Sequence, residues 1–315
     1  MRAPDDTHYD LALFAWGART LVSLAERFSI EDPLLPYWRS VGARLAPYPV
    51  DGGGGHGFNV SLGVGFNTPH RHFSHLFAMF PLHNVAWEDA DGGSAATRDL
   101  MQRSLDRWTG LTCPGAQCPN GFTYDGAISI SALMGSNASR REDAARFAVN
   151  MVRSGLLHKS TMYSEGHQPC LESPLGLASA VQDMLLQSWG GRIRVFPGVP
   201  DSWAGAVIHG FAAEGGWRVS AVRARGATQW VALTAAPADA GGAGALTATL
   251  AAPTLAAPFG TQPPGVRVEV LPSGDLRFNV SVGETVVVFG AGVAPPFVVQ
   301  ALPGNASEFN YWGDH

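Results

Sequence analysis

The chain has 315 residues, of which 46% are hydrophobic and 15% are charged, a balance that excludes an intrinsically disordered protein. Its formal net charge is -5 and Lys159 is its only lysine, which argues against a nucleic-acid-binding surface. No apolar run reaches the roughly 18 residues that a membrane span requires, and the length suits two domains of ordinary size.

Up to about residue 190 the sequence has a helical pattern. Apolar residues recur at helical spacing in four segments: residues 11–28, 97–108, 142–157 and 176–189. In the first segment they form one stripe: Leu11, Phe14, Ala15, Ala18, Val22 and Ala25. Long Gly-, Pro- and Asn-rich loops, such as residues 49–69 and 113–126, connect the helices. Helices joined in this way indicate an α/α toroid whose loops build a pocket at one end.

After Gly191 the pattern changes to short alternating segments separated by Gly, Pro or Asp turns. They are residues 192–199, 206–224, 228–236, 246–252, 266–271, 276–282 and 284–290. This spacing predicts a small antiparallel β-sandwich. We therefore expect a multidomain chain, mainly α and then β, with domains at residues 1–193 and 194–315.

The cysteines and the Asn-X-Ser tripeptides leave the compartment open. Cys113 and Cys118 flank "PGAQ" in a turn-rich loop, where they either form a short-range disulfide or remain free thiols, and Cys170 has no partner. Four tripeptides match the N-glycosylation pattern, at Asn59, Asn137, Asn279 and Asn305. Together these features suit a parent protein of the secretory pathway.

The segment "HRHFSH" admits three interpretations. His70, His72 and His75 are the residue types of a zinc or copper site, but Arg71 lies between the first two, and no Asp or Glu lies nearby as a further ligand. The same histidines could pack the start of a helix. Arg71 and the histidines could also bind a polar ligand such as a sugar, because they offer rigid donors and acceptors.

Carboxylates for acid–base chemistry occur in "MYSEGHQPCLESPLG", where Glu165 and Glu172 precede a predicted helix. A carboxylate at this place is often only a partner of the helix dipole. It could instead be a base held over a pocket, and glycoside hydrolysis requires two such carboxyl groups, an acid and a base or nucleophile.

Two longer motifs resemble a known family. "HRHFSHLFAMFPLH" looks like the HRHxSHLxxxxP signature of family 95 of the glycoside hydrolases, the inverting α-L-fucosidase family. Residues 171–203, "LESPLGLASAVQDMLLQSWGGRIRVFPGVPDSW", look like the end of that family's catalytic barrel and the entry into its β-domain. "GFAAEGGWRVSAVR" is similar to the ARGGFEV segment at the start of that domain, and the matches together span roughly residues 8 to 235.

The resemblance implies part of an (α/α)6 toroid, no cofactor and no bound metal, and an oligosaccharide or glycoconjugate substrate. It implies that Arg71 and His72 contact the sugar, with His70 and His75 shaping the pocket. Glu172 takes the position of the base-side aspartate of the family's DGNFG motif, and it is one methylene longer.

The family's asparagine pair has no match here, and its general acid precedes the region that the resemblance covers. We therefore expect the carboxy-terminal portion of an inverting exo-glycosidase for α-L-fucosides or a related sugar such as α-L-galactosides. Alone it should show little or no hydrolysis, and an exposed toroid face should cause association or poor solubility. The alternatives are a non-catalytic carbohydrate-binding protein and a histidine-based metalloprotein.

Overall fold

The computed structural model of the protein describes residues 6–52, 55–157, 162–165, 168–236, 245–252, 255 and 257–302. The tripeptide at Asn305 lies outside them. Within these ranges the chain is mainly helical to residue 185 and mainly β-stranded afterwards, as predicted. It divides into two compact units, residues 1–130 and 131–315. The domain boundary at residues 193 and 194 stays a prediction.

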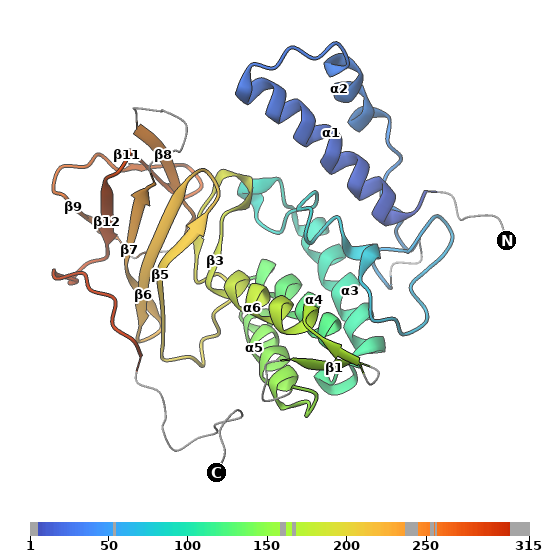
Figure 1. The fold of residues 1–315 in the computed structure, drawn as a ribbon. Coiled ribbons are helices and arrows are strands. Elements are labelled where there is room, and N and C mark those ends of the chain that lie inside the picture. The colour runs from blue at the N-terminus through green and yellow to red at the C-terminus, as the bar shows by residue number, and fades with distance from the viewer. Residues whose placement is uncertain are drawn as a thin grey trace. The chain divides into compact units, whose positions relative to one another are not determined.

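The described residues form six α-helices and four single 3-10 turns (Figure 1). The helices are α1 (His8–Phe28), α2 (Leu35–Arg44), α3 (Ala95–Thr112), α4 (Gly121–Leu133), α5 (Ala138–Arg153) and α6 (Glu172–Leu185). The turns are η1 (Ser74–Leu76), η2 (Asp89–Asp91), η3 (Pro114–Ala116) and η4 (Trp189–Gly191). The four predicted helices are present as α1, α3, α5 and α6, with shifted ends. No helix in the described part of the chain combines the length and apolar character that crossing a bilayer requires.

Helix α4 contradicts the prediction of a loop through residue 126. Its first turn is capped by Asn120, whose Oδ1 accepts a hydrogen bond from the N–H of Thr123 (3.0 Å). Gly121 and Gly126 conceal the helical pattern in the sequence. Gly126 is needed for packing, because a Cβ there would come within 2.4 Å of Cε1 of Phe73. Helix α2 was missed because it buries none of its side chains and so shows no apolar stripe.

Helix α1 has two apolar faces. Leu11, Ala18 and Ala25 are buried as the predicted stripe requires. Phe14, which was placed on the same stripe, is 63% exposed, so the prediction is wrong at this position. The exposed face carries seven large apolar side chains: Tyr9, Leu13, Phe14, Trp16, Leu21, Leu24 and Phe28. An exposed apolar surface of this kind marks an interaction site or an aggregation risk.

The predicted strand segments are confirmed, and the strands form small antiparallel sheets. A five-stranded sheet has the order β5-β6-β7-β12-β9, and a three-stranded sheet has the order β10-β11-β8 (Figure 1). Their strands are β5 (Gly205–Ala213), β6 (Trp217–Ala224), β7 (Ala227–Ala235), β8 (Ala245–Leu250), β9 (Gly260–Gln262), β10 (Glu269–Val270), β11 (Leu276–Ser281) and β12 (Thr285–Phe289). Two smaller pairs are β1 (Tyr163–Glu165) with β2 (Gln168–Cys170), and β3 (Leu186–Gln187) with β4 (Arg194–Val195). The larger sheets bury their apolar side chains in one shared cluster.

A buried ion pair connects the segment after α6 to the three-stranded sheet. Nε and Nη2 of Arg192 lie 2.8 Å from Oδ2 and Oδ1 of Asp275, a two-pronged arrangement in which the Asp275 side chain is only 3% exposed. The backbone N–H of Ala252 also donates to Oδ1 of Asp275 (2.9 Å). Burial raises the pKa of Asp275, but its hydrogen bonds outweigh this effect and hold the pKa below its ordinary value.

Asp275→Ala should lower the free energy of unfolding by about 3–5 kcal/mol, because it leaves the Arg192 guanidinium buried without its partner. Urea denaturation measures this change. Glu269→Ala is the matched control, since the Glu269–Arg277 pair is solvent-exposed and should contribute less than about 1 kcal/mol. Equal effects of the two substitutions would contradict the importance of the buried pair.

Leu21→Asp should weaken self-association of the chain, because it places a charge in the middle of the exposed α1 face. We expect the unaltered chain to form assemblies that grow with concentration in analytical ultracentrifugation. Leu62→Asp serves as the control, since Leu62 is 68% exposed but lies outside α1. An unaltered chain that stays monomeric and melts cooperatively would show that this face needs no cover.

Candidate functional site

The four residues of the predicted "HRHFSH" site separate into exposed and buried members. His70, Arg71 and His72, called here the His-Arg-His triplet, are exposed and lie just before η1. His75, within η1, is 3% exposed. The structure therefore brings the triplet together at the surface, while His75 lies beneath it in the core of the same unit.

The triplet is organised by hydrogen bonds among its own members. The N–H of His72 donates to Nδ1 of His70 (3.2 Å), and Nε of Arg71 donates to Nε2 of His72 (3.3 Å). A ring nitrogen that accepts a hydrogen bond carries no proton, so neutral His70 is protonated on Nε2 and neutral His72 on Nδ1. The triplet thus contains two imidazole N–H groups beside the guanidinium group of Arg71.

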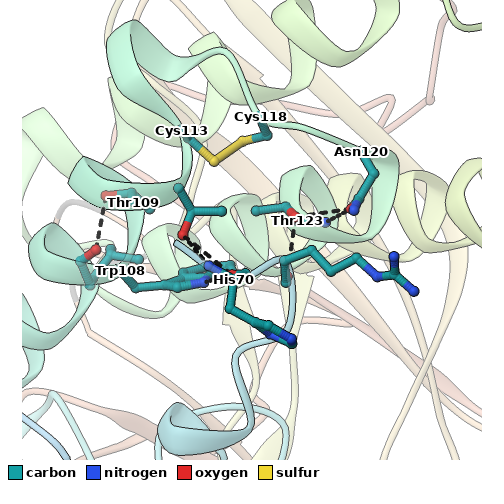
Figure 2. Close-up of a disulfide and its surroundings, with 10 residues drawn as sticks. His70, Trp108, Thr109, Cys113, Cys118, Asn120 and Thr123 are labelled. Carbon is teal, nitrogen blue, oxygen red and sulfur yellow. Dashed lines mark hydrogen bonds between the residues drawn. A yellow bond between two sulfur atoms is a disulfide. The ribbon is translucent and has the colours of Figure 1, made fainter. Parts of the chain in front are cut away.

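The backbone of the triplet is held by side chains from α3 and α4 (Figure 2). Nε1 of Trp108 and the hydroxyl of Thr112 donate to the carbonyl oxygen of His70, at 3.1 and 3.3 Å. The hydroxyl of Thr123 donates to the carbonyl oxygen of Arg71 at 3.1 Å. Sequence reasoning missed these anchors, because they lie 38 to 52 positions away along the chain. The Asn120-X-X-Thr123 capping pattern was the one local signal for α4.

Aromatic rings form a layer below the triplet. Phe73 is buried and stacks on Phe122, with ring centroids 5.2 Å apart and an interplanar angle of 19°. Phe73 also lies beside Trp108, with ring centroids 5.3 Å apart. The ring of His72 meets Phe122 edge-on at 5.3 Å. The triplet therefore combines polar donors with an adjacent, half-buried aromatic ring.

His75 and His8 are both buried in the first unit. The ring of His75 stacks on Phe66 at 4.2 Å, and its Nε2 has no hydrogen-bond partner among the described residues. His8, the first residue of α1, contacts the rings of Phe58 and Tyr48 at 4.7 and 4.9 Å. These apolar surroundings favour neutral rings, which suits a packing role.

Glu172, the predicted base, is the first residue of α6 and is exposed. Its carboxylate has no hydrogen-bond or ion-pair partner among the described residues. It belongs to the unit of residues 131–315, whereas the triplet belongs to the unit of residues 1–130. Its pairing with Arg71 and His72 therefore stays a prediction, as do the roles of all five predicted site residues.

The described part of the chain has no metal site, and it has a groove outside the triplet's unit that the predicted residues do not line. It contains no group of three or more His, Cys, Asp or Glu side chains placed to hold a metal ion. A groove of about 570 Å³ runs along β10, β11 and β12, and none of the predicted site residues lines it. The triplet remains the candidate site.

The comparisons with known proteins give one distant similarity. No family model matches the chain. Alpha-L-fucosidase 2 of Arabidopsis thaliana is 27% identical to it over 156 residues, which are 48% of this chain and 17% of the relative. The chain thus matches well under two thirds of the relative's length, and the similarity supports a loose relationship to a glycosidase.

The buried histidines should make stability depend on pH. Burial lowers the pKa of His8 to about 4 and that of His75 to about 3, from an ordinary value of 6.5. Below pH 6.5 the unfolded chain binds protons that the folded chain refuses, so stability should fall as the pH drops from about 6.5 toward 4. For His8 this lowering of the pKa corresponds to about 3 kcal/mol.

Urea denaturation between pH 7.5 and 4.5 measures this slope. His8→Leu should flatten it, because one of the two buried histidines is removed. His56→Gln is the control, since His56 is exposed in the same unit. Identical slopes for the unaltered protein and His8→Leu would refute the explanation.

Proposed function

We propose that this chain carries the sugar-binding part of an inverting exo-glycosidase that acts on α-L-fucosides or a related sugar such as α-L-galactosides. The observation that carries the proposal is the exposed His-Arg-His triplet, whose backbone is anchored by buried side chains of α3 and α4. The loose similarity to Alpha-L-fucosidase 2 supports the same class. In this proposal the helices belong to an (α/α)6 toroid and the two larger sheets form its β-sandwich.

The triplet suits a sugar for a chemical reason. Sugar hydroxyls need donors and acceptors at fixed positions, and the anchored backbone of His70 and Arg71 limits how far these groups move. Arg71 and His72 contact the sugar, while His70 and the buried His75 shape the pocket. The edge of the adjacent Phe122 ring gives the C–H groups of a sugar an apolar surface.

Glu172 is the proposed base-side carboxylate. An inverting enzyme needs a base that activates water opposite the scissile bond, within about 3 Å of that water. Its exposed position at the start of α6 leaves the carboxylate accessible. We assign the general acid to no residue of this chain and require no cofactor.

A non-catalytic carbohydrate-binding protein is the second candidate. It is favoured by the carboxylate of Glu172, which no described side chain orients. A catalytic base is usually held by such partners. Binding of a sugar without turnover would be the mark of this alternative.

Arg71→Ala should weaken L-fucose binding at least about tenfold in calorimetry, because a hydrogen bond to a charged donor contributes about 1.5–3 kcal/mol. Arg39→Ala is the control, since the Arg39 guanidinium is exposed but pairs with Glu26. Glu172→Gln should keep the affinity, and in a longer protein that also supplies the general acid it should abolish release from a nitrophenyl fucoside. Unchanged affinity in Arg71→Ala, or unchanged release in Glu172→Gln, would exclude the proposed role of that residue.

A further inference from the structure

A disulfide ties the end of α3 to the start of α4. Thr112 is the last residue of α3, and Cys113 directly after it is bonded to Cys118. Two residues later, Asn120 caps α4. The bond thus closes a five-position loop whose two flanks are helix ends, and it lies next to the anchors of the His-Arg-His triplet (Figure 2).

Side chains at the end of α3 form hydrogen bonds with both the N–H and the carbonyl oxygen of His70. The hydroxyl of Thr112 accepts from the N–H of His70 (3.4 Å) and donates to its carbonyl oxygen (3.3 Å). Trp108, one turn earlier on α3, donates to the same carbonyl (3.1 Å). Trp108 is fully buried, so this end of the helix is a rigid support.

A side chain at the start of α4 forms a hydrogen bond with the backbone of the next residue, Arg71. The Thr123 hydroxyl lies 3.1 Å from the carbonyl oxygen of Arg71 and 2.9 Å from Oδ1 of Asn120. Thr123 is completely buried, so water does not compete for its hydroxyl, whose single proton is shared between these two acceptors. Two consecutive residues of the triplet are therefore held by two different helices, and their geometry depends on the distance between those helix ends.

The loop between the helix ends contains a 3-10 turn with unfavourable backbone angles. Gly115 and Ala116 have positive φ angles of 62° and 63°, and for Ala116 this left-handed conformation is unfavourable. A covalent bond across the loop restricts the competing conformations of the chain. Cys113 is also buried, which places the bond inside the packed end of α3.

We propose that the Cys113–Cys118 disulfide, with the hydroxyls of Thr112 and Thr123, positions the backbone of His70 and Arg71 and thereby orients the ligand-binding side chains. None of these groups touches the ligand. They are positioning residues, and the effect on sugar binding rests on the proposed function. The positioning of the backbone can be tested without any ligand.

Hydrogen exchange of peptides covering residues 68–76 tests whether the backbone of His70 and Arg71 is held in place. In the double variant Cys113→Ser/Cys118→Ser these amides should exchange at least about tenfold faster, while peptides from α5 keep their rates. Cys170→Ser is the control, because Cys170 is a free cysteine. Unchanged exchange at residues 68–76 would overturn the positioning role, whatever the ligand.

Two substitutions at Thr123 separate positioning from packing. Thr123→Val keeps the shape but removes the hydroxyl, and it should accelerate exchange at residues 68–76 and lower L-fucose affinity at least about tenfold in calorimetry. Thr123→Ser keeps the hydroxyl but loses a buried methyl group, so it should be less stable yet bind normally. This pair also decides the question if the double cysteine variant does not fold.

The outcomes are distinguishable. Faster exchange with lost affinity in Thr123→Val, and normal binding in Thr123→Ser, supports the proposal. Faster exchange with unchanged affinity overturns it. If the unaltered protein binds no sugar, the proposed function fails, and the exchange measurements still decide whether the disulfide and hydroxyls position the triplet.

Discussion

Two backbone carbonyl groups, those of His70 and Arg71, join the candidate site to the rest of its unit, because each accepts a hydrogen bond from a buried helix side chain. An exposed arginine has many rotamers, and an exposed loop adds backbone freedom to them. Anchoring the backbone removes the second source of freedom and leaves the first for a ligand to restrict. The candidate site is therefore a set of donors on a fixed support, and a fixed support lowers the entropic cost of binding a ligand.

The same short segment contains both exposed and buried histidines. His70 and His72 stay in contact with water, whereas His75 packs against Phe66 and interacts with the buried His8 of α1. A positive charge on either buried ring would be costly, so docking of α1 against η1 depends on neutral imidazoles. The side of α1 that does not dock keeps its apolar residues exposed, and a neighbouring surface would have to cover them.

Patterns within one element were predictable from the sequence, and contacts between elements were not. Alternation over residues 206–224 predicted β5 and β6, and helical spacing predicted the buried Leu11, Ala18 and Ala25 of α1. The prediction that Phe14 is buried was wrong because helical spacing places an apolar residue on a stripe whether or not another surface covers that residue. Helix α4 was not predicted because its two glycines are typical of a loop. Gly126 is nevertheless required there, because the ring of Phe73 leaves no room for a Cβ. The hydrogen bonds to the backbone of His70 join positions far apart in the sequence, so no local pattern could reveal them.

The central claim is that the His-Arg-His triplet binds a sugar, and nuclear magnetic resonance of the imidazole rings tests it most directly. The chain has ten histidines, and the signals of His70 and His72 can be assigned by their loss in His70→Ala and His72→Ala. Titration with L-fucose should shift these two signals in a saturable way and leave those of His56 and His209 in place. Absence of any shift at His70 and His72, or an equal shift of His56, would contradict the account.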